Sequence, residues 1–357
     1  MVRAAALTQL VNVFDYEAAA AERLEAGPFG YFAGGAGDER TLRDNVEAYG
    51  RYLLRPRVLV DVAGCTTATT VLGHAVSMPV LVAPVAFQRL AHPDGEPATA
   101  RAARAAGTIM CLSTIATSTP AEVAATGVQR WFQLYAMRDE GITRELIAQA
   151  REHGFSALVL TADAPVPGPR ERDRRSGFVI PPHLTVAALG RGDLKPAEVL
   201  AQVSPSLTWA DVERIGSESG LPVLVKGVQT AEDARLACEH GAAGVVVSNH
   251  GGRQLDGVAA TIDLLPSVVD AVDRRIEVLL DGGIRRGPDV VKALALGARA
   301  VLAGRAVIWG LAVDGEAGAR SVLELLRAEV LNALQLLGCA SPADVRPEHV
   351  APRTSGF

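Results

Sequence analysis

Lysine, cysteine and aromatic residues are scarce in this chain of 357 residues. Its only lysines are Lys195, Lys226 and Lys292, so a lysine inside an apolar segment stands out. The four cysteines are widely spaced and form no CxxC pair, which argues against a zinc site or a dithiol motif. Because Cys111 lies within an apolar run, we expect buried free thiols, with neither disulfides nor a bound metal.

Long apolar runs and an excess of positive charge are also missing. No uninterrupted apolar run could span a bilayer, and the N-terminus lacks the basic patch and apolar core of a signal peptide. The C-terminal residues 354–357, TSGF, are not a peroxisomal signal. A net charge of −5 argues against nucleic acid or an anionic membrane as the main partner. These absences predict a soluble cytoplasmic protein.

What the chain does contain is a series of short apolar runs that alternate with helical patterns from residue 80 to the end. Its hydrophobic content of 49% is enough for a large core. The alternation is typical of repeated βαβ units. Eight runs fit parallel strands: 80–86, 109–114, 130–135, 157–163, 223–227, 244–249, 277–282 and 300–304. We therefore predict one α/β domain over residues 1–357, in which 80–357 form a (β/α)₈ TIM barrel.

The remaining segments are predicted to surround this barrel. Residues 1–79 should form an N-terminal helical cap, with a tight turn between short strands at 71–76. Helices are expected at 94–106, 139–153, 208–219, 230–240, 286–296 and about 315–337, the last packing on the barrel. Residues 165–207, rich in Pro, Gly and Arg, follow the fourth strand and should form a long lid loop. Within it, we expect residues 170–175 to be solvated and mobile, apart from Arg170.

The most informative segment is 248–256, SNHGGRQLD. It follows Gly244 to Val247, a run apolar enough to be a strand buried on both faces. His250 and Arg253 therefore stand where a buried strand runs into a glycine-containing loop. A base beside a fixed cation suits chemistry on an anionic substrate that must lose a proton. An isolated His-x-x-Arg would more often be a capped turn with a solvated arginine, so the rest of the chain must decide.

A second pattern predicts a phosphate site. The runs 278–285, VLLDGGIR, and 300–305, AVLAGR, are both apolar strands that end in Gly and then Arg. In a (β/α)₈ barrel, phosphate is often held by the loops after the seventh and eighth strands. Glycine lets the backbone approach the anion, and the arginines add charge. Two such strand ends in tandem, placed after the His/Arg strand, are a fairly specific signal.

Together these motifs resemble the FMN-dependent α-hydroxy acid oxidase and dehydrogenase family, which includes glycolate oxidase, lactate oxidase and mandelate dehydrogenase. The resemblance runs from Tyr31 to about Cys339. Its further motifs are AP at 83–84, HPDGE at 92–96, FQLY at 132–135 and LVKG at 224–227. It implies FMN-dependent oxidation of an L-2-hydroxy acid to the 2-oxo acid. It also implies reoxidation of the flavin, with O₂ as the favoured acceptor and hydrogen peroxide as the product.

The resemblance implies a role for each matching residue near the substrate. His250 would be the base, and Asp163 would orient its ring and stabilise the imidazolium. Tyr135 would lie near the substrate hydroxyl. The substrate carboxylate would be received by Tyr31, Arg170 and Arg253, because planar guanidinium groups can bind a carboxylate bidentately.

The same resemblance implies how FMN is bound. Lys226 would lie against the flavin and stabilise the negative charge of its reduced form. Backbone groups of Pro84, Val85 and Ala86 would contact the flavin. The other residues would be Ser113, Gln133, Thr161 and Ser248 at the ring and ribityl chain, and Asp281, Gly283, Arg285, Gly304 and Arg305 at the ribityl chain and phosphate.

Near the substrate the chain departs from the glycolate-oxidase-like pattern. Ile115 stands where those members have Trp, and Val85 replaces a common Thr. Residues 167–170, PGPR, stand where they have Leu-Gly-Arg-Arg, and the prolines should stiffen the start of the lid. Ile115 should enlarge the pocket and favour a larger acid than glycolate, such as one of the mandelate type.

Several alternatives stay open from the sequence alone. The acceptor could be a partner other than O₂, as in the dehydrogenases of the family, and hydride and carbanion routes are not distinguished. An FMN isomerase and a flavin-binding protein without turnover are rival hypotheses, which the full set of charged residues argues against. Because the family is often tetrameric, a homo-oligomer is expected.

Overall fold

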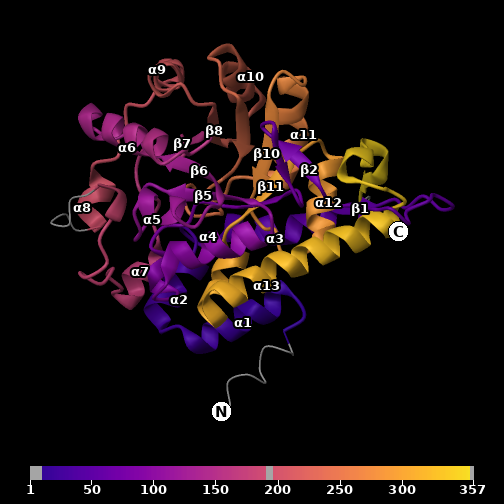
Figure 1. The fold of residues 1–357 in the computed structure, drawn as a ribbon, viewed down its shortest axis with the longest axis horizontal. Helices are drawn as coiled ribbons and strands as arrows, with labels where there is room; N and C mark the ends of the chain where they lie inside the picture. The colour runs from indigo at the N-terminus through magenta and orange to yellow at the C-terminus, as the bar shows by residue number, and fades with distance from the viewer. Residues whose placement is uncertain (1–9, 190–195, 354–357) are drawn as a thin grey trace.

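Eight parallel strands form a closed barrel in the computed structural model of this protein, which describes residues 10–189 and 196–353 (Figure 1). In chain order they are β4 Val80–Val82, β5 Ile109–Ser113, β6 Gln129–Leu134, β7 Leu158–Thr161, β8 Val223–Val228, β9 Gly244–Val247, β10 Glu277–Asp281 and β11 Ala300–Ala303. Each predicted strand segment supplies one of them, so the predicted (β/α)₈ barrel is confirmed. β4 ends before the predicted residue 86, since Pro84 has no N–H to continue the ladder.

Most residues of the barrel strands are apolar because both faces of the strands are buried, and polar residues such as Gln129 and Glu277 stand mainly at strand ends. Side chains alternate along each strand, and one set fills the inside of the barrel, including Trp131, Val159 and Leu279. The neighbouring Phe132 and Leu160 belong to the separate core between the strands and the outer helices. Cys111 lies inside the barrel and is a buried free thiol, as predicted.

Helices cover the outside of the barrel. Five of them match predicted ranges: α4 Gly95–Ala105, α6 Glu140–Glu152, α9 Trp209–Ser219, α10 Ala231–Glu239 and α12 Gly287–Ala295. Two others, α5 Pro120–Ala124 and α11 Thr261–Val272, were not predicted. In α11 a proline inside the helix, Pro266, obscures the helical pattern.

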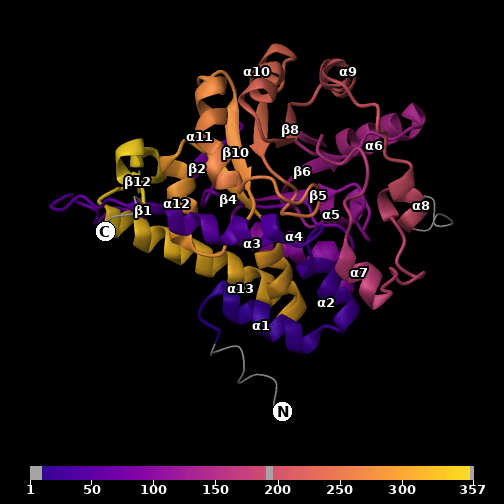
Figure 2. The ribbon, with the colours of Figure 1, turned by 180° about the vertical axis from the view of Figure 1, so that it is seen from behind.

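The last helix, α13, spans Arg305–Leu337 and begins well before the predicted residue 315. The predicted start coincides with a kink, where Asp314 and Gly315 leave helical geometry. Gly315 has φ +54°, and a Cβ there would lie 2.9 Å from the His92 ring. The two parts of α13 run along the lower face of the molecule beside α1 Val13–Arg23 (Figures 1 and 2).

The predicted N-terminal cap contains α1, α2 Ala26–Ala33, α3 Arg40–Glu47 and a 3₁₀ turn at Ala48–Arg51. The predicted hairpin is also present, as β2 Thr69–Val71 and β3 His74–Val76. One pairing was not predicted: β1 Tyr52–Leu54 pairs antiparallel with β12 Val350–Pro352. The final residues that the structure describes therefore lie against the cap (Figure 2).

The lid, residues 165–207, is less irregular than predicted. It contains α7 Glu171–Ser176, a 3₁₀ turn at Ala187–Leu189 and α8 Pro196–Ala201. Arg172, Arg174 and Arg175 are exposed, as expected, but they belong to α7, which packs against α2. Arg172 pairs with Glu39 of the cap at 2.6 Å. Part of the lid, 190–195, and the chain ends at 1–9 and 354–357 lie outside the described residues.

No helix in the described part of the chain is both long enough and apolar enough to cross a membrane. Those residues also contain no group of three or more His, Cys, Asp or Glu side chains suited to a metal ion.

A fully buried carboxylate, that of Glu96, joins the loops that follow β4 and β5. It accepts hydrogen bonds from the N–H groups of Gln88 and Thr117 and from the hydroxyls of Thr117 and Ser118, at 2.6–3.2 Å. These loops carry Pro84 to Ala86 and Ile115, so Glu96 fixes one wall of the barrel mouth.

We predict that Glu96→Leu lowers the free energy of unfolding by about 3 kcal/mol, because four buried donors lose their acceptor. Chemical denaturation would measure the change. Glu22→Leu, at an exposed position on α1, is the matched control and should change stability by less than about 0.5 kcal/mol. Equal stabilities for the two variants would contradict this role of Glu96.

Candidate active site

A cavity with an empty volume of about 1110 Å³, partly open to solvent, lies at the carboxyl ends of the barrel strands. All but two of the predicted site residues line it. The exceptions are Asp163 and Ser248, which lie behind the lining. Asp163 contacts His250, and the Ser248 hydroxyl accepts from Lys226 Nζ at 2.8 Å and from the His250 N–H at 3.1 Å.

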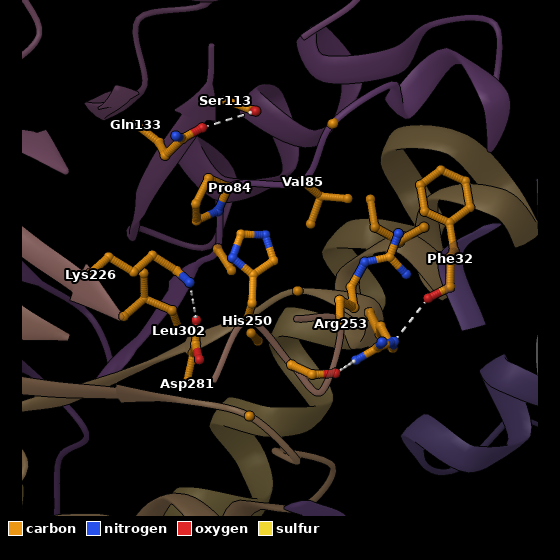
Figure 3. Close-up of a pocket in the computed structure, with 18 of the residues that line it drawn as sticks. Phe32, Pro84, Val85, Ser113, Gln133, Lys226, His250, Arg253, Asp281 and Leu302 are labelled. Carbon is orange, nitrogen blue, oxygen red and sulfur yellow. Dashed lines mark hydrogen bonds and ion pairs between the residues drawn. The ribbon is translucent and has the colours of Figure 1, made fainter. Parts of the chain in front are cut away.

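His250 is held in an uncommon backbone conformation just after β9. Its φ is +58°, and Gly251 and Gly252 follow with positive φ, so the chain turns sharply there. The ring Nδ1 lies 2.9 Å from Asp163 Oδ1. Figure 3 shows the imidazole pointing into the cavity, between Lys226 and Arg253. Since Nδ1 faces Asp163, Nε2 is the nitrogen available to a bound molecule.

Asp163 is a buried carboxylate, with a side chain only 5% exposed. Burial acts to raise its pKa, but the charge and hydrogen bond of His250, together with Lys226, hold that pKa below its usual value. The carboxylate therefore stays ionised and can stabilise a protonated His250.

Lys226 is a buried cation at the end of β8. Its Nζ lies 2.9 Å from Asp281 Oδ2, and the two side chains are 5% and 10% exposed. Burial would lower the pKa of Lys226, but the charges of Asp281 and Asp163 raise it above its usual value. The ammonium group therefore remains charged, and Figure 3 shows its contact with Asp281 as a dashed line.

Two guanidinium groups flank the ring of Tyr31. Arg253 lies 5.1 Å from the ring centroid and Arg170 lies 5.8 Å from it. Arg253 donates to the carbonyls of Tyr31 and Gly34, at 2.7 and 2.8 Å. Burial and the charge of Arg170 lower the pKa of Arg253 to about 10. Neither arginine forms an ion pair with a carboxylate among the described residues, so together they suit an incoming anion.

At the far end of the cavity, the N-terminus of α13 meets two further arginines. Gly304 is the N-cap of α13, and Arg305 is its first residue. Arg305 donates to the carbonyls of Phe32, Gly34 and Gly251, at 2.8–2.9 Å. Its burial, followed by the charges of Arg253 and Arg285, holds its pKa well below the usual value. A helix N-terminus beside buried arginines is a good phosphate site.

Gly283 keeps the backbone beside this site close to the cap. It has φ +79°, and a Cβ there would lie 1.8 Å from the Asn45 carbonyl oxygen. Nearby, Arg285 Nε and Asp281 Oδ1 are buried without a hydrogen-bond partner. Buried polar atoms of this kind are expected to meet a bound group.

Polar side chains from three neighbouring strands form a row at the barrel mouth. Gln133 accepts from the Ser113 hydroxyl at 3.1 Å and donates to Thr161 Oγ1 at 3.0 Å. Pro84, Val85 and Ala86 line the cavity beside this row. Tyr135 follows β6, and burial raises its pKa to about 12, so its hydroxyl stays protonated and can donate.

Three polar side chains that support this site were not predicted. Asn45 and Asn249 form a reciprocal pair of hydrogen bonds, both 2.9 Å, between the cap and the loop after β9. Gln254 bonds the start of the lid. Asn249 and Gln254 belong to the motif at 248–256, which could have singled them out, whereas nothing in the sequence marks Asn45.

The residues of the cavity fit FMN. A cation and a row of amide and hydroxyl groups suit a polar ring, while two arginines and a helix N-terminus suit a single terminal phosphate. Asp281 Oδ1, a buried atom without a hydrogen-bond partner, belongs to a residue that lines the same cavity, whereas Arg285 Nε lies 3.5 Å from Glu17 Oε2.

The pattern of the FMN-dependent dehydrogenase family matches residues 20–352. The chain is 50% identical to glycolate oxidase 1 of Oryza sativa subsp. indica over 353 residues, covering 96% of each protein. It is 49% identical to L-lactate oxidase of Nostoc sp. over 356 residues, covering 95% of this chain and 98% of the relative. A mandelate oxidase crystal structure superposes with a TM-score of 0.92 at 44% identity, covering 97% and 99% of the two chains. This chain therefore belongs to the FMN-dependent dehydrogenase family, and its cofactor is FMN.

Proposed function

We propose that this protein oxidises an L-2-hydroxy acid to the 2-oxo acid, and that it is an oxidase. The observation that carries the proposal is that Arg170 and Arg253 lie over the ring of Tyr31, in the cavity into which His250 points. Nδ1 of His250 faces the buried carboxylate of Asp163, which leaves Nε2 free to act as a base. A 2-hydroxy acid whose carboxylate is bound by the two arginines would present its α-carbon to His250. Relatives named glycolate, L-lactate and mandelate oxidases support the oxidase reading over a dehydrogenase with another acceptor.

In this proposal each residue around the substrate has a distinct task. Arg253 and Arg170 bind the substrate carboxylate, aided by the Tyr31 hydroxyl. Tyr135 donates to the substrate hydroxyl, which its raised pKa permits. His250 Nε2 accepts a proton from the substrate. Asp163 then stabilises the resulting imidazolium, as a carboxylate partner does in other acid–base pairs; its role is positional and electrostatic.

The chain holds the cofactor along the length of the cavity. Ser113, Gln133, Thr161 and the loop from Pro84 to Ala86 would contact the ring. Ser248 fixes Lys226, whose charge would lie near the ring and favour electron acceptance. Asp281 would bind the ribityl chain, and the phosphate would lie among Gly283, Arg285, Gly304 and Arg305. Bound FMN would supply the redox chemistry as acceptor of the substrate's electron pair, and its reoxidation by O₂ would give hydrogen peroxide as the second product.

We propose that the preferred substrate has a larger side chain than glycolate. Ile115, with 2% exposure, lines the main cavity where glycolate-oxidase-like members have Trp. A second cavity adjoins His250, Tyr135 and Arg170 on the lid side. Its remaining wall is largely apolar and includes Ala164, Pro165, Val166, Pro167 and Val203. Both features leave room for a bulky or aromatic group.

We also propose a cytoplasmic homotetramer built from a single domain. The family pattern spans both the cap and the barrel, which supports one domain. Light scattering on purified protein would give the assembly mass, and a mass equal to one 37.3 kDa chain would refute an oligomer.

An anaerobic screen tests the function directly. The protein is mixed with 2-hydroxy acids, and loss of the visible flavin absorbance is recorded before air is admitted. The proposal predicts bleaching by at least one acid, followed by rapid recovery of colour and formation of peroxide in air. Bleaching with only slow recovery would favour another acceptor, whereas no bleaching by any acid would refute the proposed reaction.

We predict that His250→Ala retains FMN but slows anaerobic flavin reduction by about 10²–10⁴-fold, because the substrate loses its base. Stopped-flow absorbance at saturating substrate would measure this. The control is His240→Ala, whose ring pairs with Glu213 on the surface and should leave the rate unchanged. Comparable reduction rates for the His250 variant and the parent would exclude His250 as the base.

We predict that the parent enzyme has at least about tenfold higher kcat/KM for mandelate than for glycolate, since burial of the added apolar group lowers the barrier. Ile115→Trp should reverse this order by filling the pocket. Steady-state peroxide assays with both acids would provide the comparison. A parent that prefers glycolate to both mandelate and lactate would show that this account of the pocket is wrong.

A further inference from the structure

The side-chain amide of Gln254 lies between two loops that carry proposed active-site residues. Its Nε2 donates to the carbonyls of Asp163 at 2.8 Å and Val166 at 3.0 Å, and its Oε1 accepts from the Gly168 N–H at 3.0 Å. All three partners are backbone groups of residues 162–169, which we name the β7 exit loop. One amide therefore directs three of its four hydrogen-bonding positions at one short stretch of chain.

The β7 exit loop has few means of holding itself in place. It contains no helix or strand. Alternate positions are prolines, which have no N–H to donate: Pro165, Pro167 and Pro169. Its start is fixed by the Ala162 N–H, which donates to the Lys226 carbonyl at 2.8 Å, and its end by the Pro169 carbonyl, which accepts from Gly37 at 2.9 Å. Between these two points, the Gln254 amide supplies the hydrogen bonds to backbone groups that neighbouring strands would provide in a sheet.

The two loops also touch directly, backbone against backbone. A Cβ on Gly168 would lie 2.3 Å from the Arg253 carbonyl oxygen and 2.8 Å from the Gln254 Cα. No side chain separates the loops at this point, so the amide bonds and the glycine together set how closely they approach.

The contact between Gly168 and the backbone of Arg253 and Gln254 joins two loops that carry charged residues of the proposed active site. The β7 exit loop contains Asp163 near its start and is followed directly by Arg170, the N-cap of α7. The facing loop carries His250 and Arg253. The distance between the two guanidinium groups thus depends on how the β7 exit loop is seated.

We propose that Gln254 is a positioning residue, which seats the start of the lid so that Arg170 and Arg253 converge on one carboxylate. The proposal rests on the proposed function of these arginines. Asp163 lies next to β7, which the barrel holds, whereas Arg170 lies at the far end of the loop. Loss of the amide should therefore displace Arg170 more than Asp163, and so affect substrate binding more than proton transfer.

The test uses the FMN-loaded enzyme with Gln254→Met, which keeps the approximate side-chain volume but has no amide. Trypsin provides a measurement that is independent of catalysis, because Arg172, Arg174 and Arg175 are exposed just beyond the loop. We expect cleavage in α7 to accelerate about tenfold or more as the lid opens more often. We expect KM to rise about tenfold or more while kcat changes less than about threefold.

Two further variants sharpen the test. Gln254→Glu cannot donate to the two carbonyls and should behave like Gln254→Met. Leu255→Ala changes the neighbouring side chain, which is 71% exposed, and should match the parent in both measurements. FMN content equal to that of the parent identifies folded variants.

Cleavage and KM both within about twofold of the parent values would overturn the proposal. Faster cleavage with unchanged KM would also overturn it, because Gln254 would then hold the loop without positioning Arg170. If no 2-hydroxy acid reduces the parent enzyme, the proposed function fails on that ground alone. Slow cleavage of Gln254→Met would then still overturn the part of this inference that concerns the loop.

Discussion

The guanidinium groups of Arg253 and Arg305 donate hydrogen bonds to backbone carbonyl oxygens at the C-terminal end of α2. Buried cations are costly unless their N–H groups are bonded, and the negative end of a helix reduces that cost. Both arginines come from the barrel, whereas α2 belongs to the cap. Without the cap Arg253 would lose both of its acceptors and Arg305 two of its three, so this contact makes the cap an essential wall of the site.

The need to compensate buried charges also explains how the charged side chains around the cavity are paired. Its two buried carboxylates, Asp163 and Asp281, already have partners in His250 and Lys226. Burial, followed by repulsion from neighbouring arginines, lowers the pKa values of Arg253 and Arg305, whose guanidinium groups donate to backbone carbonyls. Anions that lie among them relieve this repulsion. Buried cations at two places in the cavity thus favour anionic groups, which in the proposed function are the phosphate of FMN and the carboxylate of the substrate.

The barrel was predictable because most of its strands are short apolar runs followed within a residue or two by glycine or a polar residue. The lining of the site followed from the polar residues at those strand ends, such as Lys226 after Leu224 and Val225. Contacts between distant segments were not predictable: the Asn45–Asn249 pair and the β1–β12 pairing leave no local periodicity. Nor was α7, since its six residues carry charge on every face and their helical form depends on packing against α2 and on the Arg172–Glu39 pair.

The β1–β12 pairing bears on how the molecule is made. Tyr52–Leu54 are synthesised long before their partners, Val350–Pro352. This strand pair must wait until Val350–Pro352 have left the ribosome, and the closure of the barrel by β11 against β4 must wait until Ala300–Ala303 have done so. Until then the apolar side chains of the cap, such as Val13 and Phe32, have no barrel to cover, which makes nascent chains vulnerable to aggregation. Removal of Val350–Pro352 would leave β1 without its partner strand, as an exposed edge.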